Sequence, residues 1–246
     1  MGPVKNEGLY RLLDAGERAL VVEFGESVDP AVNGQVLALD TAFRAAGIEG
    51  VRETVPTYRS LMVHYDPLVI SREKLAAQVA RLEGAHPPTP KPAARWTLPC
   101  CYDPAIAEDI AELAGLAGLD VAGVARIHAG AVYRVYMYGF APGYCYLGGL
   151  PSELAVSRRA IVRPPTPENA VLVGGGLSLV ATFSMPTGWY VAGRTPARMF
   201  APQRARPFLV DVGDELRFVA IDATTFSTLE SRAMSGETIA QREALA

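Results

Sequence analysis

The residues best suited to chemistry gather between His128 and Pro151. The imidazole of His128 could act as an acid, as a base or as a hydrogen-bond donor to an anion. A strand-like run, Tyr133–Tyr138, follows, and the segment Gly139–Tyr144 then ends the strand because its glycines and proline impose special backbone angles. The pattern predicts a stiff loop that presents aromatic rings, a common setting for ligand sites. Two alternatives stay open: an aromatic-lined barrel corner without chemistry, and a His128 that stabilises a helix C-terminus.

A second run whose residues could take part in chemistry is Gly188–Pro196. Like the first, it combines aromatic residues, glycine, a charged residue and proline. Its Arg194, flanked by residues that restrict the backbone, could present a planar guanidinium to a carboxylate or phosphate. Arg159 and Arg163, four residues apart, could add positive charge if the chain folds back. Arginines that converge on an oxyanion would form an anion pocket. The alternative for these arginines is solvated loop charge.

Other familiar motifs are excluded. The triplet Gly174–Gly176 is followed by no Gly-Lys-Ser/Thr, so it is not a Walker A loop, and a bulge or close backbone packing is the better interpretation. No Gly-x-Ser-x-Gly is present, which disfavours a self-contained serine hydrolase. The three cysteines, two of them adjacent, form neither a disulfide framework nor zinc-site spacing, so we expect no metal ligands.

The elements that must position these residues fall into two parts. A Pro-rich segment, 85–95, is predicted to link an N-terminal domain (1–84) to a larger domain (96–229), with a polar, helix-prone peripheral tail at 230–246. In the first part, the order ββαββα predicts a small sheet with helices on one side. Its clearest elements are strands Arg18–Phe24, Val51–Tyr58 and Leu61–Tyr65 and helices at Pro30–Ala46 and from Ser71.

The second part is predicted to begin with one strand and two helices and to consist of β-strands after them. Short apolar runs separated by glycine and proline predict a closed barrel or sandwich. The expected elements are Trp96–Pro99, Pro104–Leu116, Asp120–His128, Tyr133–Tyr138, Ala170–Val173, Leu177–Phe183, Trp189–Ala192, Pro207–Val210 and Glu215–Ile221.

The bulk composition is that of a globular protein: half of the 246 residues are hydrophobic and a fifth are charged. The net charge of −3 gives no basic field for nucleic acid or an anionic membrane. No signal-peptide pattern or membrane-spanning apolar run is present. With so few cysteines, a reducing, cytoplasmic location is expected.

At these motifs the chain resembles the B-type subunits of bacterial 5-oxoprolinase, a family also known as allophanate hydrolase subunit 1 or Kip-type histidine kinase inhibitors. The resemblance extends roughly from residue 9 to 222. The residues that carry it are Ala19–Gly25, Glu53–Leu61, Tyr65–Pro67, His128–Pro151, Arg159, Arg163, Gly188–Pro196 and Val212–Phe218.

The resemblance implies an α+β protein, with a small α/β N-terminal domain followed by a cyclophilin-like β-barrel. It also implies a hydrolase subunit that is active only in a complex with a C-type subunit and an A-type subunit. Such complexes open the lactam of 5-oxoproline to glutamate with ATP, bound with Mg2+, and a subunit interface is one place where the nucleotide could lie. Two alternatives stay open: an inhibitor that binds a sensor histidine kinase, and a subunit of an allophanate- or urea-type carboxyltransferase.

For the site, we expect His128 to polarise or protonate the substrate carbonyl and Arg194 to bind oxygens, both as catalytic residues. The residues expected to bind the small lactam or amide or an anion are Tyr133, Gly139, Phe140, Pro142, Gly143, Tyr144, Arg159, Arg163, Gly193 and Thr195.

The chain departs from the family pattern between residues 166 and 185. Thr166–Val171, Gly175–Thr182 and Met185–Trp189 all differ, with Leu177 and Ala181 in place of an expected glutamine and tyrosine. Losing a buried polar pair from a substrate pocket would remove hydrogen bonds of about 1–3 kcal/mol each. The expectation is a changed substrate or lost turnover.

Overall fold

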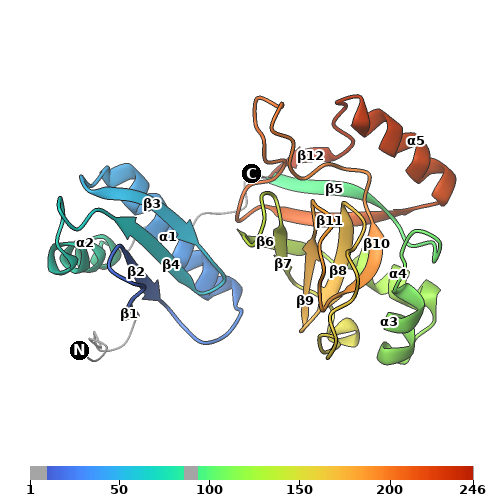
Figure 1. Ribbon diagram of the computed structural model, residues 1–246, viewed down its shortest axis with the longest axis horizontal. Helices are drawn as coiled ribbons and strands as arrows, with labels where there is room; N and C mark the ends of the chain where they lie inside the picture. Colours follow the sequence, from blue (N-terminus) through green and yellow to red (C-terminus); the bar gives the residue numbers. More distant parts are fainter. Residues whose placement is uncertain (1–9, 86–93, 246) are drawn as a thin grey trace. The chain divides into compact units, whose positions relative to one another are not determined.

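The chain divides into two compact units, residues 1–91 and 92–246. The computed structural model describes residues 10–85 and 94–245 of them (Figure 1). Most of the predicted Pro-rich linker, residues 86–93, lies outside the described residues.

The N-terminal unit is a four-stranded antiparallel sheet, in the order β1-β2-β4-β3, with two helices. Its elements are β1 (Arg11–Asp14), β2 (Ala19–Glu23), α1 (Pro30–Ala46), β3 (Val51–Pro56), β4 (Ser60–Tyr65) and α2 (Arg72–Gly84). The predicted order ββαββα is confirmed, and both helices share one core with the sheet. The strand β1 has no clear sequence signal because only Leu12 of its four residues is buried.

The two helices begin and end where local chemistry dictates. The carboxylate of Asp29 accepts hydrogen bonds from the backbone N–H groups of Ala31 and Val32, and Pro30 opens the first turn of α1. That helix ends at Gly47, whose φ of +53° is open to glycine at little cost. In α2 the hydroxyl of Ser71 caps the first turn.

The C-terminal unit is a closed seven-stranded barrel, in the order β10-β8-β9-β7-β6-β11-β5, with β5 returning to pair with β10. Its elements are β5 (Ala94–Cys101), α3 (Ile110–Ala117), α4 (Val121–Gly130), β6 (Tyr133–Tyr138), β7 (Cys145–Gly148), the 3-10 turn η1 (Ser152–Leu154), β8 (Ala170–Gly174), β9 (Leu177–Val180), β10 (Tyr190–Arg194), β11 (Glu215–Ile221), α5 (Ala223–Met234) and β12 (Gln241–Ala244). The predicted α+β class, a small α/β unit followed by a barrel, is confirmed.

Three local predictions are wrong. Pro207–Val210 is not a strand, since only Phe208 forms a bridge, to Phe200. The strand β7 is absent from the predicted elements because the glycines and proline beside it favour a loop. The predicted helix-prone tail, 230–246, is helical only to Met234, in α5; further on, β12 pairs with β5 (Figure 1), so the sheet supplies hydrogen bonds that outweigh local propensity.

Strand β8 shows how the barrel unit builds its core on both faces of a sheet. Val171 and Val173 join the main core, which also includes buried residues of α3 and α4. Ala170 and Leu172 point to the other face and pack in a second cluster with Tyr144, Ala181 and Trp189. A strand buried on both faces is recognised in a sequence as a continuous apolar run.

The helices of residues 10–85 and 94–245 are all too short or too polar to cross a membrane.

Candidate functional site

His128 lies in the last turn of α4 and is fully buried in the barrel core. Its Nδ1 is 2.8 Å from the Tyr102 hydroxyl, and its Nε2 is 3.4 Å from that of Ser178. Burial lowers the pKa of the imidazole to about 3, so the ring is neutral at physiological pH. The predicted role of His128 as an acid at a substrate carbonyl does not fit this enclosed position.

Tyr133 is also fully buried, at the start of β6. Its hydroxyl donates a 3.0 Å hydrogen bond to the backbone oxygen of His128. Its ring centroid lies 5.1 Å from that of His128. The structure therefore gives Tyr133 a packing position instead of the predicted substrate contact.

Arg159 and Arg163 do come together, but on protein carboxylates. Both pair with Asp109; Arg159 also pairs with Glu112, and Arg163 with Glu108. The Arg159 guanidinium carbon lies 4.2 Å from the centre of the Tyr190 ring. These acids, close to the start of α3, neutralise the charge predicted to bind an anion, so the structure corrects this part of the predicted pocket.

The predicted loop Gly139–Tyr144 is as stiff as its glycines and proline suggest. The backbone N–H of Gly139 donates to the oxygen of Tyr144 at 3.3 Å, which closes the loop on itself. Phe140 has a φ of +69°, rare for a residue with a side chain, and is 73% exposed. Gly143 has a φ of +76°.

This loop holds a wall of the barrel rim in place. A Cβ at Gly143 would lie 2.3 Å from the Phe200 Cβ and 2.9 Å from the Thr182 Cγ2, so only glycine allows this approach. The Thr182 hydroxyl donates to the backbone oxygen of Pro142 at 2.6 Å. Next to it, the Tyr144 hydroxyl donates to the backbone oxygen of Phe183 at 2.9 Å.

In the second predicted motif, Gly188–Pro196, the residues Gly193–Thr195 hold the backbone of Glu168 and Asn169 in place. The Arg194 Nε donates to the backbone oxygen of Glu168 at 3.2 Å, and its Nη2 pairs with Glu230. The buried Thr195 donates its backbone N–H to the oxygen of Asn169 at 3.0 Å. Arg194 is therefore engaged with the protein, contrary to its predicted catalytic role.

Gly193 is required for close packing inside the barrel. A Cβ at this position would lie 2.6 Å from the Cys100 Sγ. Its contribution is to let β10 approach β5 where the barrel closes.

Between the two motifs lies a cavity of about 220 Å3 at the barrel rim. Its lining combines aromatic, amide, hydroxyl and charged side chains: Glu168, Asn169, Thr182, Phe183, Arg198, Phe200, Ala201, Pro202 and Gln203. The size is just below that of pockets for drug-sized ligands, which suits a smaller molecule. The two motifs of the sequence thus support this cavity from behind, but none of the residues predicted for the site lines it.

Sequence reasoning misses every residue of the cavity lining. Arg198 follows directly on the predicted Gly188–Pro196 motif, so extending that motif by two residues would have included it. Glu168, Asn169 and Thr182 lie between residues 166 and 185, where a departure from the family pattern is predicted. Ala181, predicted to replace a tyrosine of the substrate pocket, instead packs in the second apolar cluster.

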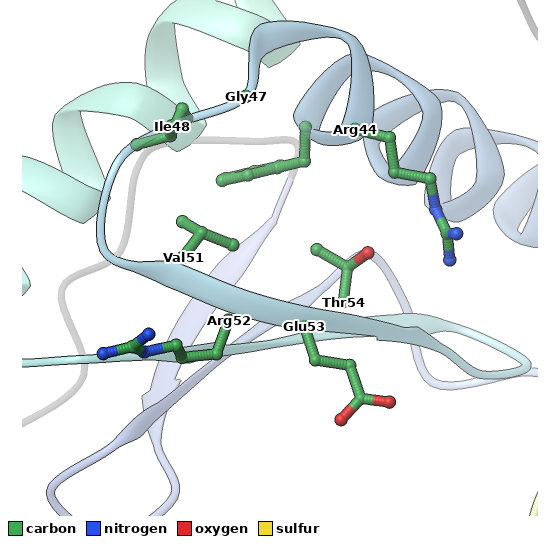
Figure 2. Close-up of a pocket in the computed structure, with 8 residues that line it drawn as sticks. Arg44, Gly47, Ile48, Val51, Arg52, Glu53 and Thr54 are labelled. Atoms are coloured by element: carbon green, nitrogen blue, oxygen red, sulfur yellow. The ribbon is translucent and has the colours of Figure 1, made fainter.

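The N-terminal unit has a larger cavity, about 490 Å3, between the end of α1 and β3 (Figure 2). Figure 2 shows Val51 and Thr54 on the helix side of β3, with Glu53 pointing to the other side. Its two arginines are engaged: Arg44 pairs with Asp40, and Arg52 pairs with Asp66. Size alone does not make a site, and the barrel cavity offers the better chemistry.

A small α/β unit followed by a closed barrel is the fold of a carboxyltransferase-type domain. Residues 10–210 match the family model "Carboxyltransferase domain, subdomain C and D". The chain is 30% identical over 223 residues to the B-type subunit of 5-oxoprolinase from Bacillus subtilis (strain 168), covering 86% of this chain and 93% of that protein. It is 32% identical over 208 residues to the corresponding 5-oxoprolinase subunit from Escherichia coli O157:H7, covering 83% and 93%. The chain belongs to this family of 5-oxoprolinase B-type subunits.

Solved structures agree. The crystal structure of TTHA0988 is 32% identical with a TM-score of 0.75, covering 84% of this chain and 40% of that one. Protein PH0987 from Pyrococcus horikoshii is 32% identical with a TM-score of 0.52, covering 87% and 99%. The K. lactis urea amidolyase is 15% identical with a TM-score of 0.79, covering 100% of this chain and 17% of that one, a likeness of fold alone.

Proposed function

We propose that this chain is the B-type subunit of a 5-oxoprolinase-type complex and binds a small lactam in the barrel-rim cavity. The observation that carries the proposal is the cavity itself, braced by two family motifs in a chain that spans 93% of the B. subtilis relative. Partner subunits of the C and A types would complete the active site. The free thiols of Cys100, Cys101 and Cys145 fit a cytoplasmic location.

In this proposal, ring opening adds water across the lactam C–N bond, so the carbonyl carbon becomes a carboxylate and the nitrogen an amine. The product from 5-oxoproline is glutamate, and ATP hydrolysis drives the step. This chain contributes binding and orientation: aromatic walls exclude water from one side of the substrate, and the braced rim fixes its position.

The described residues do not fit a site for ATP with Mg2+. The Gly174–Gly176 triplet is the turn of the β8–β9 hairpin, with positive φ at Gly175 and Gly176, and no helix follows it. The arginines 159, 163 and 194 are paired with carboxylates. Within residues 10–85 and 94–245 no group of three or more His, Cys, Asp or Glu side chains is arranged to hold a metal ion. No step is assigned to ATP on this chain.

The direct test is co-expression with the C-type and A-type partners, followed by an assay of ATP-dependent glutamate formation from 5-oxoproline. We expect turnover by the three-chain complex and none when this chain is omitted. Equal turnover with and without it would refute the proposal. A stable complex without turnover would also contradict the 5-oxoproline substrate and turn attention to other small amides.

Arg163 provides a second test, because its ion pairs with Glu108 and Asp109 indicate that it stabilises the fold and does not bind substrate. Arg163→Ala should lower the free energy of unfolding by about 2 kcal/mol, between the values of surface and buried ion pairs. The KM of the assembled complex should stay unchanged. Arg206→Ala, at the exposed pair with Asp211, is the control and should change stability by under about 1 kcal/mol. A raised KM without loss of stability would restore Arg163 to the substrate site.

A further inference from the structure

The barrel-rim cavity contains one cation that the protein leaves unused. Arg198 lines the cavity and is half-buried. Its guanidinium makes no hydrogen bond or ion pair with any residue in the described part of the chain. The neighbouring Arg204 differs: its Nη2 donates to the backbone oxygens of Met199 and Pro207. A guanidinium at a cavity wall that no protein group pairs with is hydrated in the empty cavity and is available to an anionic ligand.

The walls beside Arg198 are aromatic. Phe183 and Phe200 both line the cavity, and their ring centroids lie 6.4 Å apart with planes inclined at 57°. Behind the wall, the ring of Phe200 packs against the ring of Phe208, with the two centroids 5.1 Å apart, and this contact supports the wall. Phe183 is 38% exposed although it is a large apolar side chain, so it offers free apolar surface to a ligand.

We propose that Arg198 binds the carboxylate of the substrate, while the apolar ring of the substrate lies against Phe183 and Phe200. This inference rests on the proposed function and adds to it the residue that selects a lactam with a carboxylate over one without. A planar guanidinium offers two parallel N–H donors to a carboxylate, and the pair is stronger where water is partly excluded. Apolar carbons of the ring cover the aromatic surface, and the lactam group faces the open side, where a partner subunit reaches it.

The test is isothermal titration calorimetry on the full chain with 5-oxoproline and with 2-pyrrolidone, the same lactam ring without the carboxylate. Wild type should bind 5-oxoproline at least about tenfold more tightly. Arg198→Ala should abolish that preference, and Arg198→Lys should restore part of it because a point charge replaces the planar fork. Arg217→Ala, an exposed arginine on β11, is the matched control and should behave as wild type.

The outcomes separate this inference from the proposed function. Equal binding of the two ligands by wild type, or binding of neither, overturns the role of Arg198. So does an Arg198→Ala complex that forms glutamate with an unchanged KM, although the proposed function would then stand. Conversely, a carboxylate preference that requires Arg198, in a complex without turnover, supports the site and contradicts 5-oxoprolinase activity.

Discussion

Replacing Gly143 by alanine is expected to abolish measurable binding of 5-oxoproline and to lower the free energy of unfolding by about 2–4 kcal/mol. Two penalties add. The φ of +76° is strained for any residue with a Cβ, and the new methyl would overlap Phe200 and Thr182. Both neighbours line the cavity, so relieving the overlap moves the wall that the ligand contacts. Calorimetry measures the binding, and urea denaturation measures the stability.

Gly176 supplies the control. Its φ is +75°, almost the same as at Gly143, but a Cβ there would meet nothing within 4 Å. Gly176→Ala therefore imposes the backbone strain without the overlap and should lower stability by about 1–2 kcal/mol while leaving binding intact. If both variants lose the same stability and both keep binding, the Gly139–Tyr144 loop does not brace the cavity.

Local signals are sufficient to predict most of the fold. The predicted helix from Pro30 to Ala46 has its start and stop in its own sequence, because Asp29 caps its first turn and Gly47 ends it. The strands that escape prediction lack such signals. β12 is polar and fully exposed, and its strand form depends on pairing with β5, about 145 residues earlier in the chain. No local pattern encodes such a partner.

The candidate site, too, is predictable from the sequence only where the signal is local. Glycine and proline predict where the backbone is unusual, and the loop Gly139–Tyr144 does support the cavity. The arginines predicted to bind an anion are paired with protein carboxylates, because charge alone does not reveal a partner. Asp109 lies 50 residues before Arg159, and only the fold brings them together. Arg198 is the reverse case, an arginine without a motif that the described part of the fold leaves unpaired at the cavity.

His128→Ala should lower the free energy of unfolding of the barrel unit by about 3–5 kcal/mol. The imidazole packs against the rings of Tyr133 and Phe218, at centroid distances of 5.1 Å and 4.9 Å. Its removal leaves a cavity and takes the hydrogen-bond partner from the buried Tyr102 hydroxyl. Both tryptophans, Trp96 and Trp189, belong to this unit, so their fluorescence follows its unfolding directly.

The pH dependence of stability tests the same position. Burial lowers the pKa of folded His128 to about 3, against 6.5 when unfolded. Below pH 6.5 the unfolded chain binds a proton that the folded chain does not, so stability falls as the pH falls from 6.5 toward 3. Between about pH 7 and pH 5, wild type should lose about 2 kcal/mol more than His128→Ala. Both proteins share the same carboxylates, whose contributions therefore cancel in the difference. Parallel pH profiles would mean that His128 reaches solvent and takes up its proton in the folded state, which would reopen its role as an acid.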